Sequence, residues 1–388
     1  MTGTTSVLEV SDVAQSVKPA ARVAHLTSVH TAFDVRIFQK ECRSLASAGY
    51  DVVLIAPHGR DETVEGVKIE SVTRREDRSR RMTATVRQVY LRAIRSGATL
   101  FHFHDPELIP VGVLLKLRGK RVIYDVHENV AQDVLTKDWI HPRVRRFVST
   151  VARIVESASA RIFDGVVAAT PAIAGTLPKD NCLLLQNFPI VGELVNETAL
   201  PYRDRDPMVV YAGSITEMKG ARQMVSAMHL LPENLSARLL LLGDVESASL
   251  RSQLTASLGW SKVDHLGFQP RGTLAQMLGR ARVGLVLFQP LPNYDDSQPN
   301  KLFEYMSAAL PIVASNFPVW RDLIEKVGCG LVVNPLDASE IAKAIAWILE
   351  HPSEAEAMGR RGQMAVASIY NWESQAQSLL RLYDRLLR

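Results

Sequence analysis

Residues 208–231 read MVVYAGSITEMKGARQMVSAMHLL: a short apolar run, a turn that contains glycine, and a stretch with apolar residues at helical spacing. The run at 208–212 is typical of a buried strand, because it is short and apolar and Gly213 follows it directly. The periodicity of residues 219–231 predicts a helix. A buried strand followed by a helix is the repeating unit of parallel sheets that helices cover on both faces.

The same alternation extends in both directions from this stretch. Before it, the pattern predicts strands at 21–26, 51–56, 100–103, 121–126 and 164–169, and helices at 36–48 and 142–160. After it, the pattern predicts strands at 238–243, 283–288, 311–315 and 331–333, then helices at 338–349, 353–368 and 372–387. We therefore expect an α/β protein with two doubly wound halves that face a cleft at the carboxyl ends of their strands.

Residues 187–207 interrupt this alternation, since they are rich in proline and charge and have little periodicity. The predicted organisation is a flexible N-terminus at 1–20, an N-terminal domain at 21–188, a linker at 189–206, a C-terminal domain at 207–370 and a final helix at 371–388 that packs back toward the N-terminal domain. A chain of 388 residues is long enough to bury two such cores.

Composition and spacing exclude several classes of protein. The chain is 47% hydrophobic and 22% charged, as folded globular proteins are. Its three cysteines lie far apart, so neither a disulfide framework nor a thiolate zinc site is expected. The first residues lack the parts of a signal peptide, and no apolar run is long enough to cross a membrane. We expect a cytoplasmic protein, with the inner face of the cell membrane as an alternative location.

The signatures of several common enzyme classes are missing. Neither half begins with the glycine pattern of a dinucleotide site, and there is no Walker A, G-x-S-x-G or H-E-x-x-H segment. The sequence therefore argues against a nicotinamide oxidoreductase, a P-loop NTPase, an α/β-hydrolase and a zinc protease.

Positive charge gathers in the first half of the chain, where arginine is frequent between Arg74 and Arg95. A basic surface favours partners that carry phosphate, but nucleic acid is not expected because no aromatic residues alternate with the arginines. Apolar residues at helical spacing from Met82 to Ile94 allow two interpretations. One is a helix that lies on the membrane surface, and the other is an ordinary helix packed on the sheet.

Two segments carry the chemistry. In the first, GSITEMKG at 213–220, Gly213 lets the backbone approach a ligand, and the start of the following helix offers N–H groups to an anion. Lys219 adds a charge that suits a diphosphate, although an ordinary turn with an exposed lysine explains the segment equally well.

The second segment is QPNKLFEYMSAALPIVAS at 298–315. Asn300 is expected to cap a helix whose first turn holds Lys301 and Glu304. The Glu304 carboxylate then either binds two ribose hydroxyls or belongs to a capping box.

Taken together, these segments resemble family 4 of the retaining glycosyltransferases, which have the GT-B architecture of two Rossmann-like domains. The N-terminal half agrees through HLTSVH at 25–30, FHFHDPE at 101–107 and YDVHEN at 124–129. The resemblance implies that the C-terminal half binds a nucleotide diphosphate sugar and the N-terminal half binds the acceptor. It also implies transfer with retention, without a metal or other cofactor.

The resemblance assigns roles residue by residue. Lys219 would contact the donor diphosphate, Glu304 the donor ribose, and His127 the reaction centre, so these three are the expected catalytic residues. The backbone near 265–269 would hold the base. The expected donor-binding residues are Gly213, Ser214, Lys219, Gly243, Phe268, Asp296, Lys301 and Glu304, and those expected on the acceptor side are His30, Arg36, His104 and Asp105.

The chain departs from the family pattern at three places. Ser214 stands where the family often has an arginine beside the diphosphate, and Asp296 stands where it has the first glutamate of its signature. The glycine-rich loop after the first strand is replaced by SVHTAFDVR at 28–36, in which Arg36 is a candidate substitute cation. A metal site made by His104, Asp105, His127 and Glu128 is not expected, because adjacent residues on a strand end rarely point together.

The predicted function is transfer of a hexosyl group from a UDP-sugar to a hydroxyl acceptor, in polysaccharide or glycolipid assembly. One alternative is a nucleotide-sugar epimerase of the same architecture, although carboxylates for its acid and base are not evident. Another is a degenerate nucleotide-sugar-binding protein without transfer activity. A two-lobed solute receptor is disfavoured because no secretion signal is seen.

Overall fold

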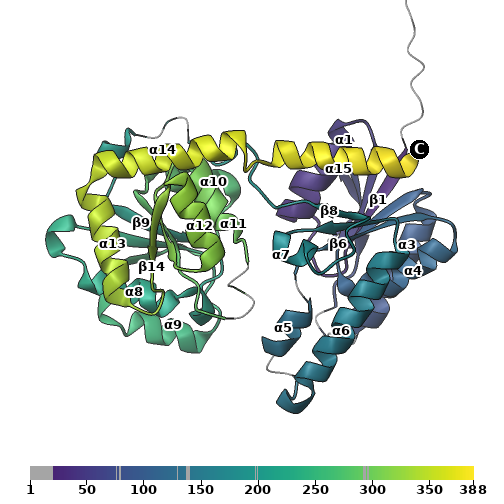
Figure 1. Ribbon diagram of the computed structural model, residues 1–388, viewed down its shortest axis with the longest axis horizontal. Coiled ribbons are helices and arrows are strands. Elements are labelled where there is room, and N and C mark those ends of the chain that lie inside the picture. Colours follow the sequence, from purple (N-terminus) through teal and green to yellow (C-terminus); the bar gives the residue numbers. More distant parts are fainter. Residues whose placement is uncertain are drawn as a thin grey trace, which may run out of the picture.

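The computed structural model describes residues 21–75, 77, 80–128, 130–136, 140–196, 198, 200–291, 294 and 297–388. Two α/β units lie side by side, and helix α15 (Trp372–Leu387) runs from the second unit back over the first (Figure 1). The predicted flexible N-terminus at 1–20 lies outside the described residues.

The first unit is built on an eight-stranded sheet with the order β3-β4-β2-β1-β5-β6-β7-β8. Five strands follow the predicted runs, namely β1 (Arg22–Leu26), β2 (Asp51–Pro57), β5 (Leu100–Phe103), β6 (Arg121–Val126) and β7 (Gly165–Ala168). Three were not predicted: β3 (Glu62–Val64), β4 (Val67–Val72) and β8 (Cys182–Leu184). Strand β3 pairs antiparallel with β4 at one edge of the sheet, and Glu65 and Gly66 make the tight turn with positive φ angles of 49° and 78°.

Helices cover both faces of this sheet. They are η1 (Val35–Cys42), α1 (Arg43–Ser47), η2 (Arg81–Thr85), α3 (Val86–Arg95), η3 (Pro106–Leu108), α4 (Ile109–Leu117), α5 (Val130–Thr136), α6 (Pro142–Ile162) and α7 (Pro171–Ala174). The helix predicted at 36–48 is thus two pieces, a π-helical η1 and an α-helical α1. The Asp34 carboxylate begins η1 by accepting hydrogen bonds from the backbone N–H groups of Arg36 and Ile37, at 2.8 and 3.0 Å.

The second unit has a six-stranded, fully parallel sheet with the order β11-β10-β9-β12-β13-β14. Its strands are β9 (Met208–Ala212), β10 (Arg238–Leu242), β11 (Val263–His265), β12 (Val283–Val286), β13 (Ile312–Ser315) and β14 (Gly330–Val333). Its main helices are α8 (Ala221–Leu230), α9 (Ala248–Thr255), α10 (Arg271–Arg280), α11 (Asn300–Ser307), α12 (Pro318–Val327), α13 (Ala338–Glu350) and α14 (Pro352–Ser368). Short helical turns are η4 (Tyr202–Asp204), η5 (Glu217–Lys219), η6 (Glu233–Leu235) and η7 (Leu258–Lys262).

Helix α15 buries its apolar side in the first unit. Trp372, Leu379 and Tyr383 belong to the same apolar cluster as Val23 of β1 and Ile123 of β6. The Trp372 indole N–H donates to Ser44 Oγ over 2.9 Å. The end of the chain therefore closes one face of the N-terminal sheet, and its burial ties the two units together.

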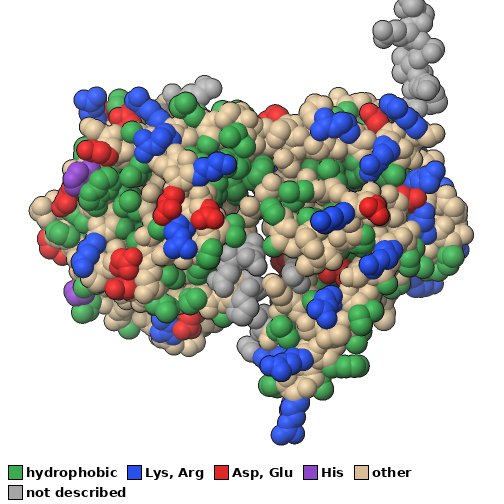
Figure 2. Space-filling model, viewed as in Figure 1, with side chains coloured by type: hydrophobic (Ala, Val, Ile, Leu, Met, Phe, Trp, Pro, Cys, Tyr) green, Lys and Arg blue, Asp and Glu red, His purple; other side chains and the backbone are tan. Residues whose placement is uncertain are grey.

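The burial of helix α3 decides between the two interpretations of the basic segment from Met82 to Ile94. Val89 and Ala93 of α3 are fully buried against the sheet, so α3 packs as an ordinary covering helix. Helix α6 has exposed apolar side chains instead, among them Val144, Phe147, Val151 and Ile154. Figure 2 shows hydrophobic and basic side chains together on its projecting end. Among the described residues, no helix is both long and apolar enough to span a membrane.

Glu156 of α6 gives the first unit a pH-dependent stability. Its side chain is buried, Oε1 lies 3.4 Å from the Tyr124 hydroxyl, and burial raises the pKa of its carboxyl to about 7. The ordinary value in an unfolded chain is 4.5. The folded state therefore holds this proton more tightly, and the resulting stabilisation is complete below pH 4.5 and is lost as the pH rises through 7.

We predict that Glu156→Gln removes this dependence. The free energy of unfolding of the variant relative to the wild type should rise by about 3 kcal/mol between pH 4.5 and pH 8. Urea denaturation across this range measures it. Glu325→Gln, at an exposed position of α12, is the matched control and should follow the wild type. Equal pH profiles for Glu156→Gln and the wild type would contradict the prediction.

Candidate functional site

Two adjoining cavities lie between the units. One, of about 610 Å³, is lined mainly by the first unit, and the other, of about 720 Å³, mainly by the second. Both are lined by His127, Glu128, Thr170, Gln298 and Asn300, so they form one continuous cleft. The cleft lies beyond the carboxyl ends of β6, β7 and β9, as the doubly wound pattern predicts.

A close backbone crossing shapes the second unit's wall of the cleft. Gly213 and Gly243 follow β9 and β10 with φ angles of 125° and 152°, and a Cβ on Gly243 would stand 2.1 Å from the Gly213 carbonyl oxygen. The Gly213 N–H donates to the Leu242 carbonyl over 2.7 Å. His265 Nε2 lies 2.8 Å from the Gly243 carbonyl oxygen and braces the same crossing. Glycine is required there because any side chain would push the two strand ends apart.

Two lysines converge on this turn. Lys301 is 8% exposed, and its Nζ has no hydrogen-bond partner among the described residues. That Nζ lies 3.9 Å from the Tyr211 ring centroid and would lie 3.1 Å from a Cβ on Gly213. Lys219 Nζ lies 3.2 Å from Ser214 Oγ, and both lysines line the second cavity.

The charges of these lysines oppose each other. Burial, and then the charge of Lys219, lower the pKa of Lys301 to about 7. Burial also lowers the pKa of Lys219. A bound anion would relieve both effects, because it replaces the lost hydration of each ammonium group and screens their repulsion.

Two backbone N–H groups at this turn have partners within the chain. The Lys219 N–H donates to Thr216 Oγ1 over 3.1 Å, and the Ala221 N–H donates to the Thr216 carbonyl over 3.3 Å. Helix α8 begins at Ala221, after Gly220 with a φ of 73°. Thr216 therefore caps this segment, and these two N–H groups are not available to an anion.

Glu304 lies in the second cavity and is held by an arginine. Arg271 Nη1 donates to Glu304 Oε1 over 2.5 Å, while its Nε and Nη2 each lie 2.7 Å from a carboxylate oxygen of Glu193. These two carboxylates outweigh the effect of burial and raise the pKa of Arg271. The pairing fixes one oxygen of Glu304.

The capping-box interpretation of this segment is wrong. The residue before α11 is Pro299, and no side chain caps the helix in the described part of the chain. Asn300 begins the helix, and Glu304 is turned toward Arg271. No sequence signal identified Arg271 or Glu193, because both come from other elements.

The first unit's wall of the cleft is organised around Asp125. Its Oδ2 lies 2.6 Å from His127 Nε2 and 3.1 Å from His104 Nδ1, and Arg36 donates to its two oxygens over 2.9 Å each. Burial alone would raise the pKa of Asp125, but Arg36 and His127 hold it well below its usual range. His127 thus stands at the junction of the two cavities with a carboxylate behind it.

Arg36 lines the first cavity but is not a free cation. It is 5% exposed, pairs with Asp125, and donates to the Leu185 carbonyl over 2.9 Å. Its positive charge compensates the buried carboxylate of Asp125. The hypothesis that Arg36 substitutes for a missing diphosphate contact is therefore not supported.

The other residues predicted on the acceptor side also line the first cavity. Asp105 Oδ2 accepts from Thr27 Oγ1 over 2.8 Å and from the Ser28 N–H over 2.6 Å, which fixes the loop after β1. His30 lies 3.5 Å from carboxylate oxygens of Asp34 and Asp105. Burial lowers the pKa of His30, but these carboxylates outweigh it and raise the pKa overall.

Most of the predicted donor residues come together, one lies apart from them, and one is outside the described residues. Gly213, Ser214, Lys219, Lys301 and Glu304 line the second cavity. Gly243 supports it through the backbone crossing. Phe268 is 76% exposed and is not among the residues that line the described cavities. Asp296 lies outside the described residues.

Both halves of the chain match known families. Residues 196–364 match the model of glycosyl transferases group 1, and residues 35–181 match that of glycosyltransferase family 4. MJ1607 of Methanocaldococcus jannaschii, described as an uncharacterized glycosyltransferase, is 24% identical over 182 residues, which cover 47% of this chain and 45% of that protein. The alignments span about half the length of the curated relatives that the chain matches.

Solved structures agree over almost the whole chain. Sucrose-phosphate synthase of Thermosynechococcus elongatus superposes with a TM-score of 0.74 at 21% identity, covering 95% of this chain and 99% of that one. HepE of Anabaena, solved with UDP-glucose, superposes with a TM-score of 0.71 at 13% identity, covering 94% and 99%. At these identities the likeness establishes the GT-B fold.

The matched segments correspond to the two units of the structure, one family model to each sheet. The resemblance inferred from the two donor-side segments and the histidine-rich strand ends is thereby confirmed. The chain belongs to the GT-B glycosyltransferases of family 4, the glycosyl transferases group 1.

Proposed function

We propose that this chain is a retaining glycosyltransferase that moves a hexosyl group from a nucleoside diphosphate sugar to a hydroxyl acceptor. The observation that carries the proposal is the pair of lysines, Lys219 and Lys301, beside the Gly213 turn. Their charges lack a compensating carboxylate at hydrogen-bond distance among the described residues, and they face a cavity that also contains Glu304. A diphosphate next to a ribose fits this set of groups.

The reaction would proceed across the junction of the two cavities. The diphosphate lies on Lys219 and Lys301, its ribose hydroxyls on Glu304, and the sugar projects toward His127. As the glycosidic bond breaks, the lysines stabilise the negative charge of the leaving diphosphate. The acceptor hydroxyl attacks from the same face, which retains the configuration, and a leaving phosphate oxygen takes its proton. Two lysines supply the positive charge here, so we propose that transfer needs no metal at the diphosphate.

UDP is the proposed nucleotide. HepE, which shares the fold, was solved with UDP-glucose, and this supports uracil as the first base to test. The acceptor enters from the first cavity, beside His30, His104 and Asp105. We further propose a cytoplasmic enzyme of polysaccharide or glycolipid assembly. The exposed apolar and basic side chains of α6 support contact with a lipid-linked acceptor.

Turnover with a panel of UDP-sugars tests the function. Release of UDP that increases with hydroxyl acceptors, with the product anomer matching the donor by NMR, is the expected result. His127→Gln should reduce kcat by about 100-fold or more. Interconversion of the donor sugar without an acceptor would instead indicate an epimerase, and binding without turnover a degenerate transferase.

The lowered pKa of Lys301 predicts that the affinity for the donor depends on pH. An empty site holds Lys301 with a pKa of about 7, and a bound diphosphate must raise it. Affinity for a UDP-sugar, whose phosphates do not titrate near neutrality, should therefore fall as the pH rises above 7, approaching tenfold per unit. Calorimetry in buffers of different ionisation enthalpy should detect proton uptake on binding.

The matched variants are Lys301→Met, which keeps the packing of the side chain on Tyr211, and Lys343→Met at an exposed position of α13. Lys301→Met should weaken binding by about 2 kcal/mol and abolish proton uptake, whereas Lys343→Met should do neither. Unchanged proton uptake in Lys301→Met would contradict this assignment.

If Glu304 binds the ribose hydroxyls, its replacement should remove that contact and leave the other donor contacts in place. Glu304→Gln leaves Arg271 paired with Glu193, so the variant should remain folded. The wild type should bind UDP about tenfold more tightly than 2′,3′-dideoxy-UDP, and Glu304→Gln should bind the two equally well. Titration calorimetry of the wild type and of Glu304→Gln with each of the two ligands measures these affinities. A preference for UDP that survives in Glu304→Gln places the ribose elsewhere.

A further inference from the structure

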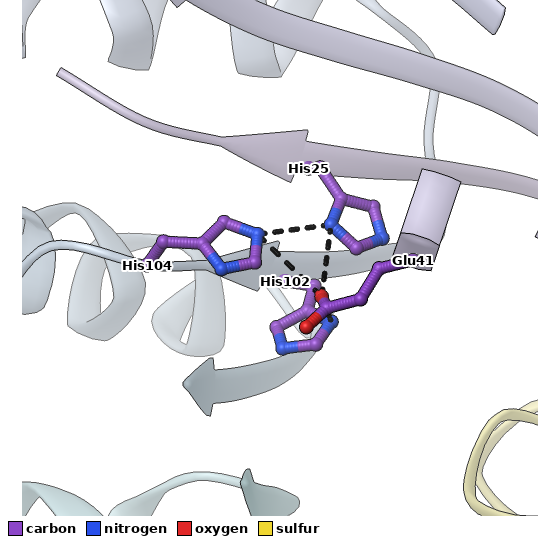
Figure 3. Close-up of side chains that lie close together, drawn as sticks. All are labelled: His25, Glu41, His102 and His104. Carbon is purple, nitrogen blue, oxygen red and sulfur yellow. Dashed lines mark hydrogen bonds and ion pairs between the residues drawn. The ribbon is translucent and has the colours of Figure 1, made fainter. Parts of the chain in front are cut away.

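Behind the cleft, four ionisable side chains meet inside the first unit (Figure 3). His25 lies on β1 and His102 opposite it on β5, His104 follows the end of β5, and Glu41 comes from η1. The four side chains have no measurable exposure in the folded chain. We call this group the histidine cluster. It is distinct from the donor side of the cleft, although His104 also contacts Asp125.

The ligand atoms of the histidine cluster are spaced as a small cation requires. His25 Nδ1 lies 2.9 Å from His104 Nε2. Glu41 Oε2 lies 3.8 Å from His25 Nδ1, 3.8 Å from His102 Nδ1 and 4.0 Å from His104 Nε2. Four ligands bound tetrahedrally at zinc distances stand roughly 3.3 Å from one another. All four ligand atoms lie within 4.8 Å of one another, so a contraction of the cluster would bring them onto one ion.

Polar atoms of this cluster have no hydrogen-bond partner in the described part of the chain. They are Oε1 and Oε2 of Glu41 and Nε2 of His102. Arg36 Nε pairs with Glu41 Oε1 over 3.1 Å, so, among the described residues, Glu41 Oε2 and His102 Nε2 are the atoms of the cluster without a hydrogen bond or an arginine partner. Buried carboxylates are almost always hydrogen-bonded, paired or metal-bound, because desolvation without a partner is costly. These orphan atoms point to a ligand.

The chemistry of the cluster matches the same kind of ligand. Three imidazoles and one carboxylate are donors that zinc and similar ions accept.

Groups outside the cluster orient its rings. The Tyr383 hydroxyl lies 2.9 Å from His25 Nε2, behind the Nδ1 that faces the cluster. It also lies 2.9 Å from His102 Nδ1, which is the atom that faces Glu41, so Tyr383 is an outer contact for His25 alone. On the other side, the Asp125 carboxylate lies 3.1 Å from His104 Nδ1. Phenol and carboxylate partners behind ligating histidines are the usual outer contacts of metal sites.

We propose that His25, Glu41, His102 and His104 bind a divalent transition-metal cation of the zinc class. Four protein ligands close the site, so the ion ties β1, β5 and η1 together and has no open position for a substrate. It also fixes His104, and through Asp125 the ring of His127 at the cleft. The grouping of His104, Asp105, His127 and Glu128 weighed from the sequence is different, since the Asp105 carboxylate is occupied by Thr27 and Ser28.

The test is metal binding by the full chain after removal of metal with a chelator. Co²⁺ should bind at one equivalent and give the visible absorption of a tetrahedral imidazole–carboxylate complex. Zn²⁺ should displace it and raise the Tm. Metal analysis of protein purified without chelator should find one zinc-class ion per chain. No absorption band, no Tm shift and no bound ion in the wild type would overturn the proposal.

Variants separate this site from other histidines. Glu41→Gln keeps the shape of the side chain and should weaken Co²⁺ binding by more than about tenfold, and His102→Asn serves if Glu41→Gln folds poorly. His58→Asn, which removes a surface histidine paired with Glu62, is the matched control and should bind like the wild type. His127→Gln should also keep the absorption band. Wild-type affinity in both Glu41→Gln and His102→Asn would place any bound metal elsewhere. The readout is independent of the donor, so failure of the proposed transferase activity would leave it unaffected.

Discussion

Asp125 is a fully buried carboxylate on which the functional wall of the first unit depends. Arg36 neutralises it from η1, and His104 and His127 contact its Oδ2 from two other segments. A charge at this depth is tolerable only because these partners replace water. The π-helical geometry of η1 places Arg36 and Glu41 on the inner side, and Asp34 fixes where that helix begins. His127 therefore reaches the cleft from a rigid base.

The second unit uses the opposite arrangement. There, among the described residues, the charges at the cleft that lack an oppositely charged partner are cations, and Glu304, which lines the same cavity, is already engaged by Arg271. One wall thus holds a compensated carboxylate beneath a histidine, and the other holds lysines that an anion would compensate. A phosphorylated ligand bound on the second unit would have its reactive end at His127, where the two cavities meet. Two features fix the position of one wall relative to the other. Helix α15 packs on the first unit, and Gln186 Nε2 donates to Gln298 Oε1 over 2.5 Å.

The sequence predicted the interior strands well because each is a nearly continuous apolar run. It missed β3, β8 and β11, which are three residues long and lie at sheet edges, where burial is partial and the apolar signal is weak. It also missed β4, which lies beside an edge and whose sequence, VKIESV, is not a continuous apolar run. Motif spacing identified Lys219, Lys301 and Glu304, which share a cavity. It did not identify Arg271, Glu41 or Asp125. These residues have partners on other elements, and contacts of this kind produce no periodic pattern in the sequence. The capping role expected for Asn300 failed for a local reason, since Pro299 precedes a helix that begins at Asn300 itself.

The most direct test of the central claim is a crystal structure of the full chain with UDP bound. The account predicts the β-phosphate within hydrogen-bond distance of Nζ of both Lys219 and Lys301, and the ribose hydroxyls on the free oxygen of Glu304. A diphosphate bound away from both lysines, or on the first unit's wall beside Asp125, would contradict it.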